Sequence, residues 1–208
     1  MKITALATLT LVAAVASNAI AQAPARPAAT RDTAVFAGGC FWGIQAVFER
    51  VTGVTATVSG FSGGTAVRPS YDDVSTGNTG HAESVEVIYD PARVTYNTLL
   101  KVFFGVALDP TELNHQGPDD GTQYRSALFV RNATQKAQAQ AYIAELTRNK
   151  VWSKPIVTEV TPFKAFYAAE SYHQGFYDAN PTYPYIVYND KPKVEALKKK
   201  FPTLYNGK

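Results

Sequence analysis

Residues 39–43 read Gly-Cys-Phe-Trp-Gly, and this pentapeptide marks the junction between the first strand and the first helix that the sequence predicts. An apolar segment typical of a strand, residues 33–37, comes before it, and a segment typical of a helix, residues 41–50, begins inside it. Cys40 therefore falls at a helix start, where unpaired backbone N–H groups and the positive end of the helix dipole favour a thiolate. A lone cysteine is nevertheless more often a small buried hydrophobe, and the pentapeptide alone leaves that alternative open.

Cys40 is the only cysteine among the 208 residues, so the chain forms no internal disulfide. The two glycines before it, Gly38 and Gly39, allow a sharp turn that leaves the sulfur uncovered. Phe41 and Trp42 follow the thiol directly and provide a large aromatic surface beside it. We therefore expect a nucleophilic sulfur that attacks a small, partly apolar group.

The first residues have the pattern of a secretory signal peptide. Lys2 gives a short positive region, residues 3–16 are apolar, and Ala-Ile-Ala at residues 19–21 is a cleavage signal. The apolar run is too short to span a bilayer as a stable helix. We expect cleavage after Ala21, export to the periplasm, and no membrane attachment afterwards.

The rest of the chain has the size and composition of one catalytic domain. Residues 22–31 are rich in proline and alanine and are expected to form a flexible leader, and residues 32–208 are expected to form a single domain. The formal net charge of +3, one less without the signal peptide, gives no ground for nucleic-acid binding. The lysines at residues 198–200 are expected on the solvated face of a terminal helix, and we expect a monomer.

The segments alternate in a way that predicts an α+β fold. Strand patterns and helix patterns follow one another in the order β-α-β-β-α-β-α-β, which is neither doubly wound nor all-β. We expect a two-layer ferredoxin-like sandwich, with a mixed sheet and helices packed against it. Beyond the first strand and helix, the expected strands are residues 54–61, 83–89, 127–130 and 155–160. One further helix is expected to begin at Thr95, and another is expected to cover residues 134–149.

Glu83 is the first candidate partner for Cys40. Successive side chains of the expected strand at residues 83–89 alternate between its two faces. Glu83 shares one face with Val85 and Val87, and that face is expected to point inward. A carboxyl in apolar surroundings has a raised pKa and can act as a general acid. The other interpretation is a glutamate at the start of a strand, exposed to water, and the pattern alone favours neither.

Two polar loops contain further candidates. The loop at residues 117–126 includes Tyr124, and Tyr71 lies in an earlier loop; either phenol could donate a hydrogen bond to a substrate oxygen, although most of the twelve tyrosines must have structural roles. His173 or His81 could instead pair with Cys40 as the base of a Cys-His hydrolase, so that interpretation stays open. With one cysteine and no H-x-x-x-H spacing, the sequence argues against a zinc site.

Four motifs, in this order, resemble those of the peptide methionine sulfoxide reductases of the A type. They are Gly-Cys-Phe-Trp-Gly at residues 39–43, Thr-Gly-His-Ala-Glu at 79–83, Asp-Asp-Gly-Thr-Gln-Tyr-Arg-Ser at 119–126 and Tyr-His-Gln at 172–174. The resemblance covers residues 34–201. It implies thiol-dependent reduction of free and peptide-bound methionine-S-sulfoxide, and thus repair of oxidised proteins, without a metal or an organic cofactor.

The resemblance also assigns roles to single residues. Cys40 matches the nucleophile that attacks the sulfoxide sulfur and becomes a sulfenic acid. Glu83 matches the acid that protonates the sulfoxide oxygen, and Tyr71 and Tyr124 match the phenols that hold that oxygen. Four residues are expected to bind the substrate. Phe41 and Trp42 match the wall that takes the substrate methyl group, Asp119 matches an orienting acid, and Tyr185 is the fourth candidate.

The chain departs from the family pattern at one position. Many members have a recycling cysteine directly after a tyrosine that Tyr185 resembles, and the residue here is Ile186. Because no second thiol exists, an external thiol must attack the sulfenic acid, and we expect a thioredoxin-like or glutaredoxin-like protein. Two rival interpretations are the Cys-His hydrolase and a secreted module whose Phe41 and Trp42 bind apolar side chains without catalysis.

Overall fold

The structure is a computed structural model that describes residues 31–208. The predicted signal peptide and all of the predicted leader except Arg31 lie outside the described residues. Within the described part, no helix combines the length and the apolarity needed to cross a bilayer.

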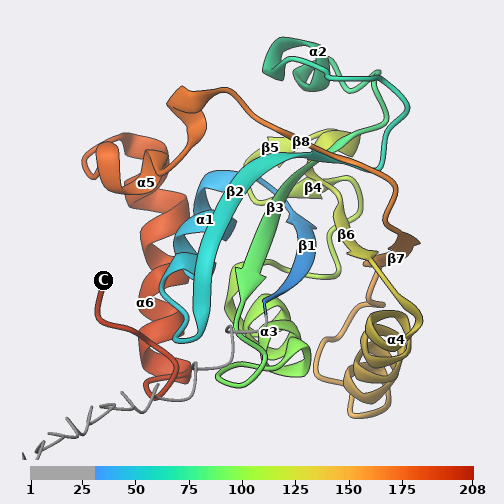
Figure 1. The fold of residues 1–208 in the computed structure, drawn as a ribbon, viewed down its shortest axis with the longest axis vertical. Coiled ribbons are helices and arrows are strands. Elements are labelled where there is room, and N and C mark those ends of the chain that lie inside the picture. The colour runs from blue at the N-terminus through green and yellow to red at the C-terminus, as the bar shows by residue number, and fades with distance from the viewer. Residues whose placement is uncertain (1–30) are drawn as a thin grey trace, which may run out of the picture.

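A six-stranded sheet forms the centre of the described chain (Figure 1). Its strands are β1 (Asp32–Gly38), β2 (Val54–Ser62), β3 (Ala82–Tyr89), β6 (Ser126–Val130), β7 (Glu159–Pro162) and β8 (Phe166–Ala168). They follow the order β7-β6-β1-β3-β2-β8, in which only β6 and β7 are parallel. The predicted α+β class with a mixed sheet is therefore confirmed. A separate two-stranded sheet contains β4 (His115–Gln116) and β5 (Asp119–Asp120).

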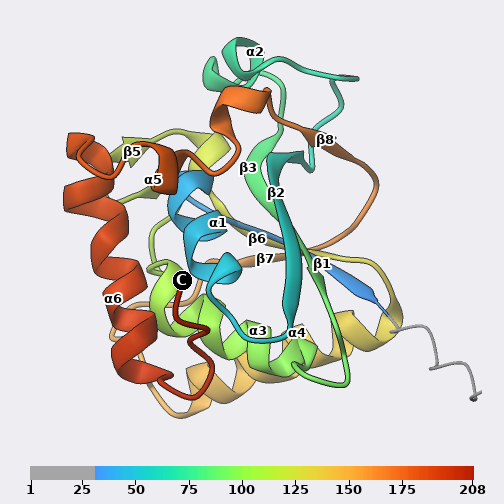
Figure 2. The same cartoon turned by 60° about the vertical axis from the view of Figure 1, so that its left-hand side comes forward.

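Helices connect and cover these strands. They are α1 (Phe41–Glu49), α2 (Tyr71–Ser75), α3 (Tyr96–Val102), α4 (Ala133–Arg148), α5 (Phe176–Ala179) and α6 (Lys191–Lys200). Figures 1 and 2 show α1 and α6 side by side, and α1 packs on β2. In both views α2 lies at the opposite end of the sheet from α3 and α4. Shorter turns are η1 (Phe103–Ala107), η2 (Thr122–Tyr124), η3 (Ser171–His173) and η4 (Ile186–Asp190).

The central strand β1 is buried on both faces, which explains its continuous apolar sequence. Ala34 and Phe36 point into the main core, where the ring of Phe36 stacks on that of Phe48 of α1 at 4.7 Å. Val35 and Ala37 belong to a smaller cluster on the other face. Because β1 is fixed from both sides, the residue that follows it is held in a defined place.

The structure corrects the predicted elements in three places. The last predicted strand, residues 155–160, begins later as β7, because parallel pairing with β6 sets its register. The helix α2 was not predicted; its five residues are held by a capping box between Ser70 and Asp73. The strand β8 was not predicted either, because its three residues are defined by pairing with the distant β2 rather than by a local pattern.

Candidate active site

The turn between β1 and α1 places Cys40 at the N-cap position of α1. Gly39 has a φ angle of 89°, and a Cβ there would lie 2.5 Å from the side chain of Gln116, so only glycine fits. The amide of Gln116 in turn accepts a hydrogen bond from the backbone of Asp109 at 2.6 Å and donates one back at 3.0 Å. The predicted sharp turn is present, but the loop that contains Gln116 packs over it.

Cys40 is only 7% exposed, so the prediction of an uncovered sulfur is wrong. The predicted thiolate is also wrong for the resting chain. Burial raises the pKa of the Cys40 thiol well above its ordinary value, and the Glu83 and Asp190 carboxyls raise it further. The backbone N–H of Trp42 and the ammonium of Lys193 oppose this shift. They do not outweigh it, because a helix dipole contributes only about 0.3–1 kcal/mol to an anion.

Glu83 lies at the inner end of β3, next to the nucleophile. Its side chain is 3% exposed, and its Oε2 accepts a hydrogen bond of 3.0 Å from the backbone N–H of Phe41. Val85 and Val87 on the same face are fully buried. The predicted inward face is therefore confirmed, and the exposed-glutamate interpretation is wrong.

The protonation state of Glu83 follows from its burial. Loss of hydration raises the pKa of Glu83 to about 8, although the hydrogen bond from Phe41 lowers it; the Asp119 and Asp190 carboxyls add to the increase. The group is therefore mostly a neutral acid at pH 7, and it becomes a carboxylate as the pH rises through 8. This is the charge state that a general acid needs.

Tyr71 and Tyr124 face the same cluster from two different loops. Tyr71 begins α2, where its backbone N–H donates to Glu170 at 2.9 Å, and Tyr124 ends η2. Burial raises the pKa of both phenols, and the nearby Glu83 carboxyl raises it further. Both side chains remain protonated and are hydrogen-bond donors at neutral pH.

Trp42 is fixed by aromatic contacts and one hydrogen bond. Its ring stacks on Phe176 at 3.8 Å and meets the edge of Tyr185 at 5.8 Å. Its indole N–H donates to Nδ1 of His173 at 3.1 Å. Phe41 is fully buried against Phe61, Tyr71 and His173. The two aromatic residues after Cys40 therefore form a rigid wall.

The two candidate histidines hold structure together. Burial lowers the pKa of His173, partly opposed by Glu170, so the imidazole is neutral and can accept the indole proton of Trp42. His81 accepts from the backbone N–H of Gly64 at 3.2 Å and contacts the carbonyl of Ala66 at 2.8 Å. The sequence indicated His173 but not its task, because the Trp42 partner lies 131 residues away.

Asp119 and Tyr185 form a second part of the wall. The hydroxyl of Tyr185 donates to Oδ2 of Asp119, which the pairing of β4 with β5 holds in place. Burial raises the pKa of Asp119, and the Tyr185 hydroxyl and Lys193 oppose this increase. Burial, then the Cys40 and Asp119 side chains, raise the pKa of Tyr185.

The structure thus brings all eight predicted site residues to one place, around the first turn of α1. The sequence did not indicate Gln116, Phe176, Asp190 or Lys193, since none stands in a pattern that distinguishes it from loop or helix neighbours.

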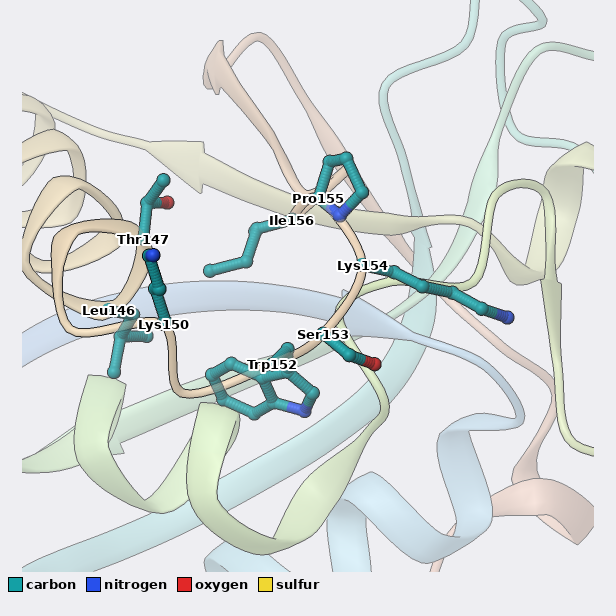
Figure 3. A pocket seen from close by; sticks show the side chains of 8 residues that line it. All are labelled: Leu146, Thr147, Lys150, Trp152, Ser153, Lys154, Pro155 and Ile156. Atoms are coloured by element: carbon teal, nitrogen blue, oxygen red, sulfur yellow. The ribbon is translucent and has the colours of Figure 1, made fainter.

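A separate hollow lies between the end of α4 and the loop after it (Figure 3). It contains no carboxylate, histidine or cysteine, and it shares no residue with this cluster; its lining residues are Leu146, Thr147, Lys150, Trp152, Ser153, Lys154, Pro155 and Ile156.

Comparisons with known proteins point to one group. The family model described as "Peptide methionine sulfoxide reductase" matches residues 32–204. The chain is 59% identical to peptide methionine sulfoxide reductase MsrA 2 of Mesorhizobium japonicum, over 85% of this chain and 91% of that protein. It is 51% identical to MsrA 2 of Synechocystis, over 82% and 79%.

Solved structures agree with the sequence relatives. The reduced form of Mxr1 from Saccharomyces cerevisiae has a TM-score of 0.70 and 34% identity, over 76% of this chain and 90% of that one. Methionine sulfoxide reductase A of Corynebacterium diphtheriae has a TM-score of 0.64 and 35% identity, over 76% and 77%.

The buried thiol leads to a prediction about reactivity. We expect iodoacetamide to alkylate Cys40 at a rate whose inflection lies above pH ~8.5, the ordinary pKa of cysteine, and at least about 10-fold below that of a free thiol at pH 7.5. The measurement is mass spectrometry of the Cys40 peptide over a pH series, with Cys40→Ser as the background control. An inflection below pH ~8.5 would mean that the helix start, rather than burial, sets the charge of the sulfur.

Proposed function

Because this chain belongs to the peptide methionine sulfoxide reductase family, it reduces methionine-S-sulfoxide to methionine with a thiol as reductant, and we propose that Cys40 and Glu83 carry the chemistry. One observation carries this assignment: Glu83 bonds to the backbone N–H of Phe41, the residue directly after the nucleophile. The carboxyl of Glu83, from β3, is thereby held beside the sulfur of Cys40 at the first turn of α1.

In the proposed reduction, the sulfur of Cys40 attacks the sulfoxide sulfur while Glu83 protonates the sulfoxide oxygen. The phenols of Tyr71 and Tyr124 donate hydrogen bonds to that oxygen as negative charge develops on it. The oxygen then passes from the substrate sulfur to the sulfur of Cys40, methionine leaves with the electron pair of the bond between the two sulfurs, and Cys40 becomes a sulfenic acid. Burial supports the roles of Glu83 and of both phenols, because it keeps these three groups protonated at neutral pH.

We propose that the aromatic wall selects the substrate. Phe41 and Trp42 would contact the methyl group on the sulfoxide sulfur, and their fixed rings favour an apolar group of defined size. Asp119 and Tyr185, joined by their hydrogen bond, would orient the rest of the substrate beside Trp42.

Recycling needs a thiol from outside the chain. Ile186 is fully buried where many relatives have a recycling cysteine, and Cys40 is the only thiol. We infer that a thioredoxin-like or glutaredoxin-like protein forms a mixed disulfide with Cys40 and then releases it with its own second thiol.

The Cys-His hydrolase is not favoured. His173 uses Nδ1 to accept the indole proton of Trp42, and His81 is engaged by backbone groups of its own loop. A base that activates the thiol must be free to take its proton. The geometry therefore supports sulfoxide reduction over acyl transfer.

Further expectations rest on sequence and topology. We propose export to the periplasm from the signal-peptide pattern of residues 1–21, and a monomer without membrane attachment. We also propose that β1, α1, β2, β3, α3 and β6 form the ferredoxin-like unit. The antiparallel strand order β6-β1-β3-β2 supports that arrangement.

Replacement of the proposed acid tests the mechanism. We expect Glu83→Gln to lower kcat by roughly 10²-fold, the usual effect of losing a general acid, and to abolish the loss of activity that the parent shows above pH 8. The measurement is the pH dependence of reduction of N-acetylmethionine sulfoxide with dithiothreitol. Glu86→Gln, on the same strand but paired with Arg131 at 3.7 Å, is the matched control and should keep full activity.

An unchanged kcat in Glu83→Gln would remove Glu83 from the chemistry. A change in KM alone would make it a binding group.

The single cysteine gives a prediction about the oxidised product. After one turnover without added thiol, we expect one dimedone adduct per chain, on Cys40, and no disulfide, because no partner thiol exists. Mass spectrometry of the Cys40 peptide makes the measurement, with Cys40→Ser as the control that forms neither adduct nor methionine. Stoichiometric formation of methionine with Cys40 still a free thiol would place the oxidation at another residue.

A further inference from the structure

Asp190 is a buried carboxyl that the reduction scheme leaves unused. It ends the π-helical turn η4 and is fully buried, yet neither carboxyl oxygen accepts a hydrogen bond from any residue in the range 31–208. It occupies the N-cap position of α6, but its side chain makes no capping bond there. An ionised carboxylate without hydrogen bonds is costly to bury, so stability does not explain its presence. π-Helical turns of this kind are frequent at functional sites.

The carboxyl lies against the first turn of α1. A Cβ on Gly43 would be 2.1 Å from Oδ1 of Asp190 and 3.1 Å from Nζ of Lys193. The Asp190 carboxyl and the Lys193 ammonium can therefore lie against this turn only because Gly43 has no side chain. Gly43 is the third residue after the N-cap Cys40, and an N-cap side chain points toward the second and third residues of its helix. Asp190 and the sulfur consequently lie at the same turn, close enough for the Asp190 carboxyl to raise the pKa of the Cys40 thiol.

Lys193 stabilises the ionised form of Asp190. Its ammonium lies 3.5 Å from Oδ1, as an ion pair within the first turn of α6. Burial raises the pKa of Asp190 to about 6, the ammonium of Lys193 opposes the increase, and Asp119 adds to it. Asp190 is thus mostly a carboxylate at pH 7.

Asp190 and Glu83 flank one thiol in opposite states. The pKa of Glu83 is about 8, so at pH 7 one carboxyl can give a proton and the other can take one. Two carboxyls whose surroundings separate their pKa values in this way identify an acid and a base. The titratable groups that face Asp190 from the surrounding elements are Cys40, Glu83, Asp119, Tyr177, Tyr185 and Lys193.

We propose that Asp190 is the base of the reduction step: it takes the proton that the Cys40 thiol loses when its sulfur attacks the sulfoxide. This inference rests on the proposed roles of Cys40 and Glu83. The buried thiol requires such a group, because a sulfur that is not a thiolate at rest needs a proton acceptor in order to attack.

The step is balanced in atoms, electrons and protons. The S–H bond of Cys40 breaks and its proton goes to Asp190, while a bond forms between the two sulfurs and Glu83 protonates the oxygen. The hydroxyl then leaves the substrate sulfur with its bonding pair and bonds to the sulfur of Cys40, while the bond between the two sulfurs breaks and its electron pair stays with methionine. The thiol is thereby oxidised to a sulfenic acid as the sulfoxide is reduced. Asp190 returns its proton to the Glu83 carboxylate, so both groups are restored and no further reactant is needed.

Asp190→Asn tests the proposal through two rates that should change in opposite directions. The first is single-turnover reduction of N-acetylmethionine sulfoxide without added thiol, from pH 5 to 9. We expect the parent to lose rate below about pH 6, and the variant to lack this acid limb and to react roughly 10²-fold more slowly at pH 7. The second is alkylation of Cys40 by iodoacetamide, which should become faster, because a negative charge that disfavours the thiolate is gone.

Two further variants complete the test. Lys193→Met keeps the carboxyl but removes the ammonium, so the acid limb should move to higher pH and alkylation of Cys40 should slow. Glu195→Gln removes an exposed carboxylate from the same helix and is the matched control, with both rates unchanged.

The possible outcomes are distinct. If Asp190→Asn reduces the sulfoxide as fast as the parent, or keeps the acid limb, the inference is wrong. An acid limb that stays in place in Lys193→Met also overturns it. If Glu83→Gln is slow while Asp190→Asn is not, only this inference fails; if Glu83→Gln is unimpaired, the proposed function of the site fails first.

Discussion

The hydrogen bond from the backbone N–H of Phe41 to Oε2 of Glu83 joins the start of α1 to the start of β3, and the site depends on it. It supplies a partner to one of the unpaired N–H groups of the helix start, and it fixes the carboxyl beside the nucleophile. Strand β1 makes this possible, because its two buried faces determine where Cys40 emerges. The aromatic wall and the two phenols are then arranged around a fixed pair of reacting groups.

Burial, rather than the helix dipole, determines the charges in this pair. A helix start is worth about 0.3–1 kcal/mol to an anion, whereas the burial of an ionised group without full compensation costs several kcal/mol. Cys40 and Glu83 therefore both remain protonated at neutral pH, and the negative charge of the site is carried by Asp190 beside Lys193. A neutral acid is available for the sulfoxide oxygen, while the thiol depends on a base.

Local sequence patterns predicted those parts of the fold that local physics determines. The alternation of Glu83, Val85 and Val87 correctly identified the inward face of β3, and the turn after β1 was predicted from its glycines. The cover over Cys40 was missed because Gln116 comes from a loop far along the chain. Asp190 was missed for a related reason: its importance comes from contact with Gly43 of α1, which no pattern within the terminal helix reveals. His173 was found as a candidate, but only its contact with Trp42 shows what it does.

The central claim is that burial holds Glu83 as a neutral acid at the pH at which the enzyme works. Difference infrared spectroscopy between the parent and Glu83→Gln measures this directly, because a carboxylic acid and a carboxylate absorb at separate frequencies. We expect the carboxylic-acid band of Glu83 to persist at pH 7 and to disappear around pH 8. A carboxylate band already complete at pH 6 would contradict the account, because Glu83 would then have no proton to give.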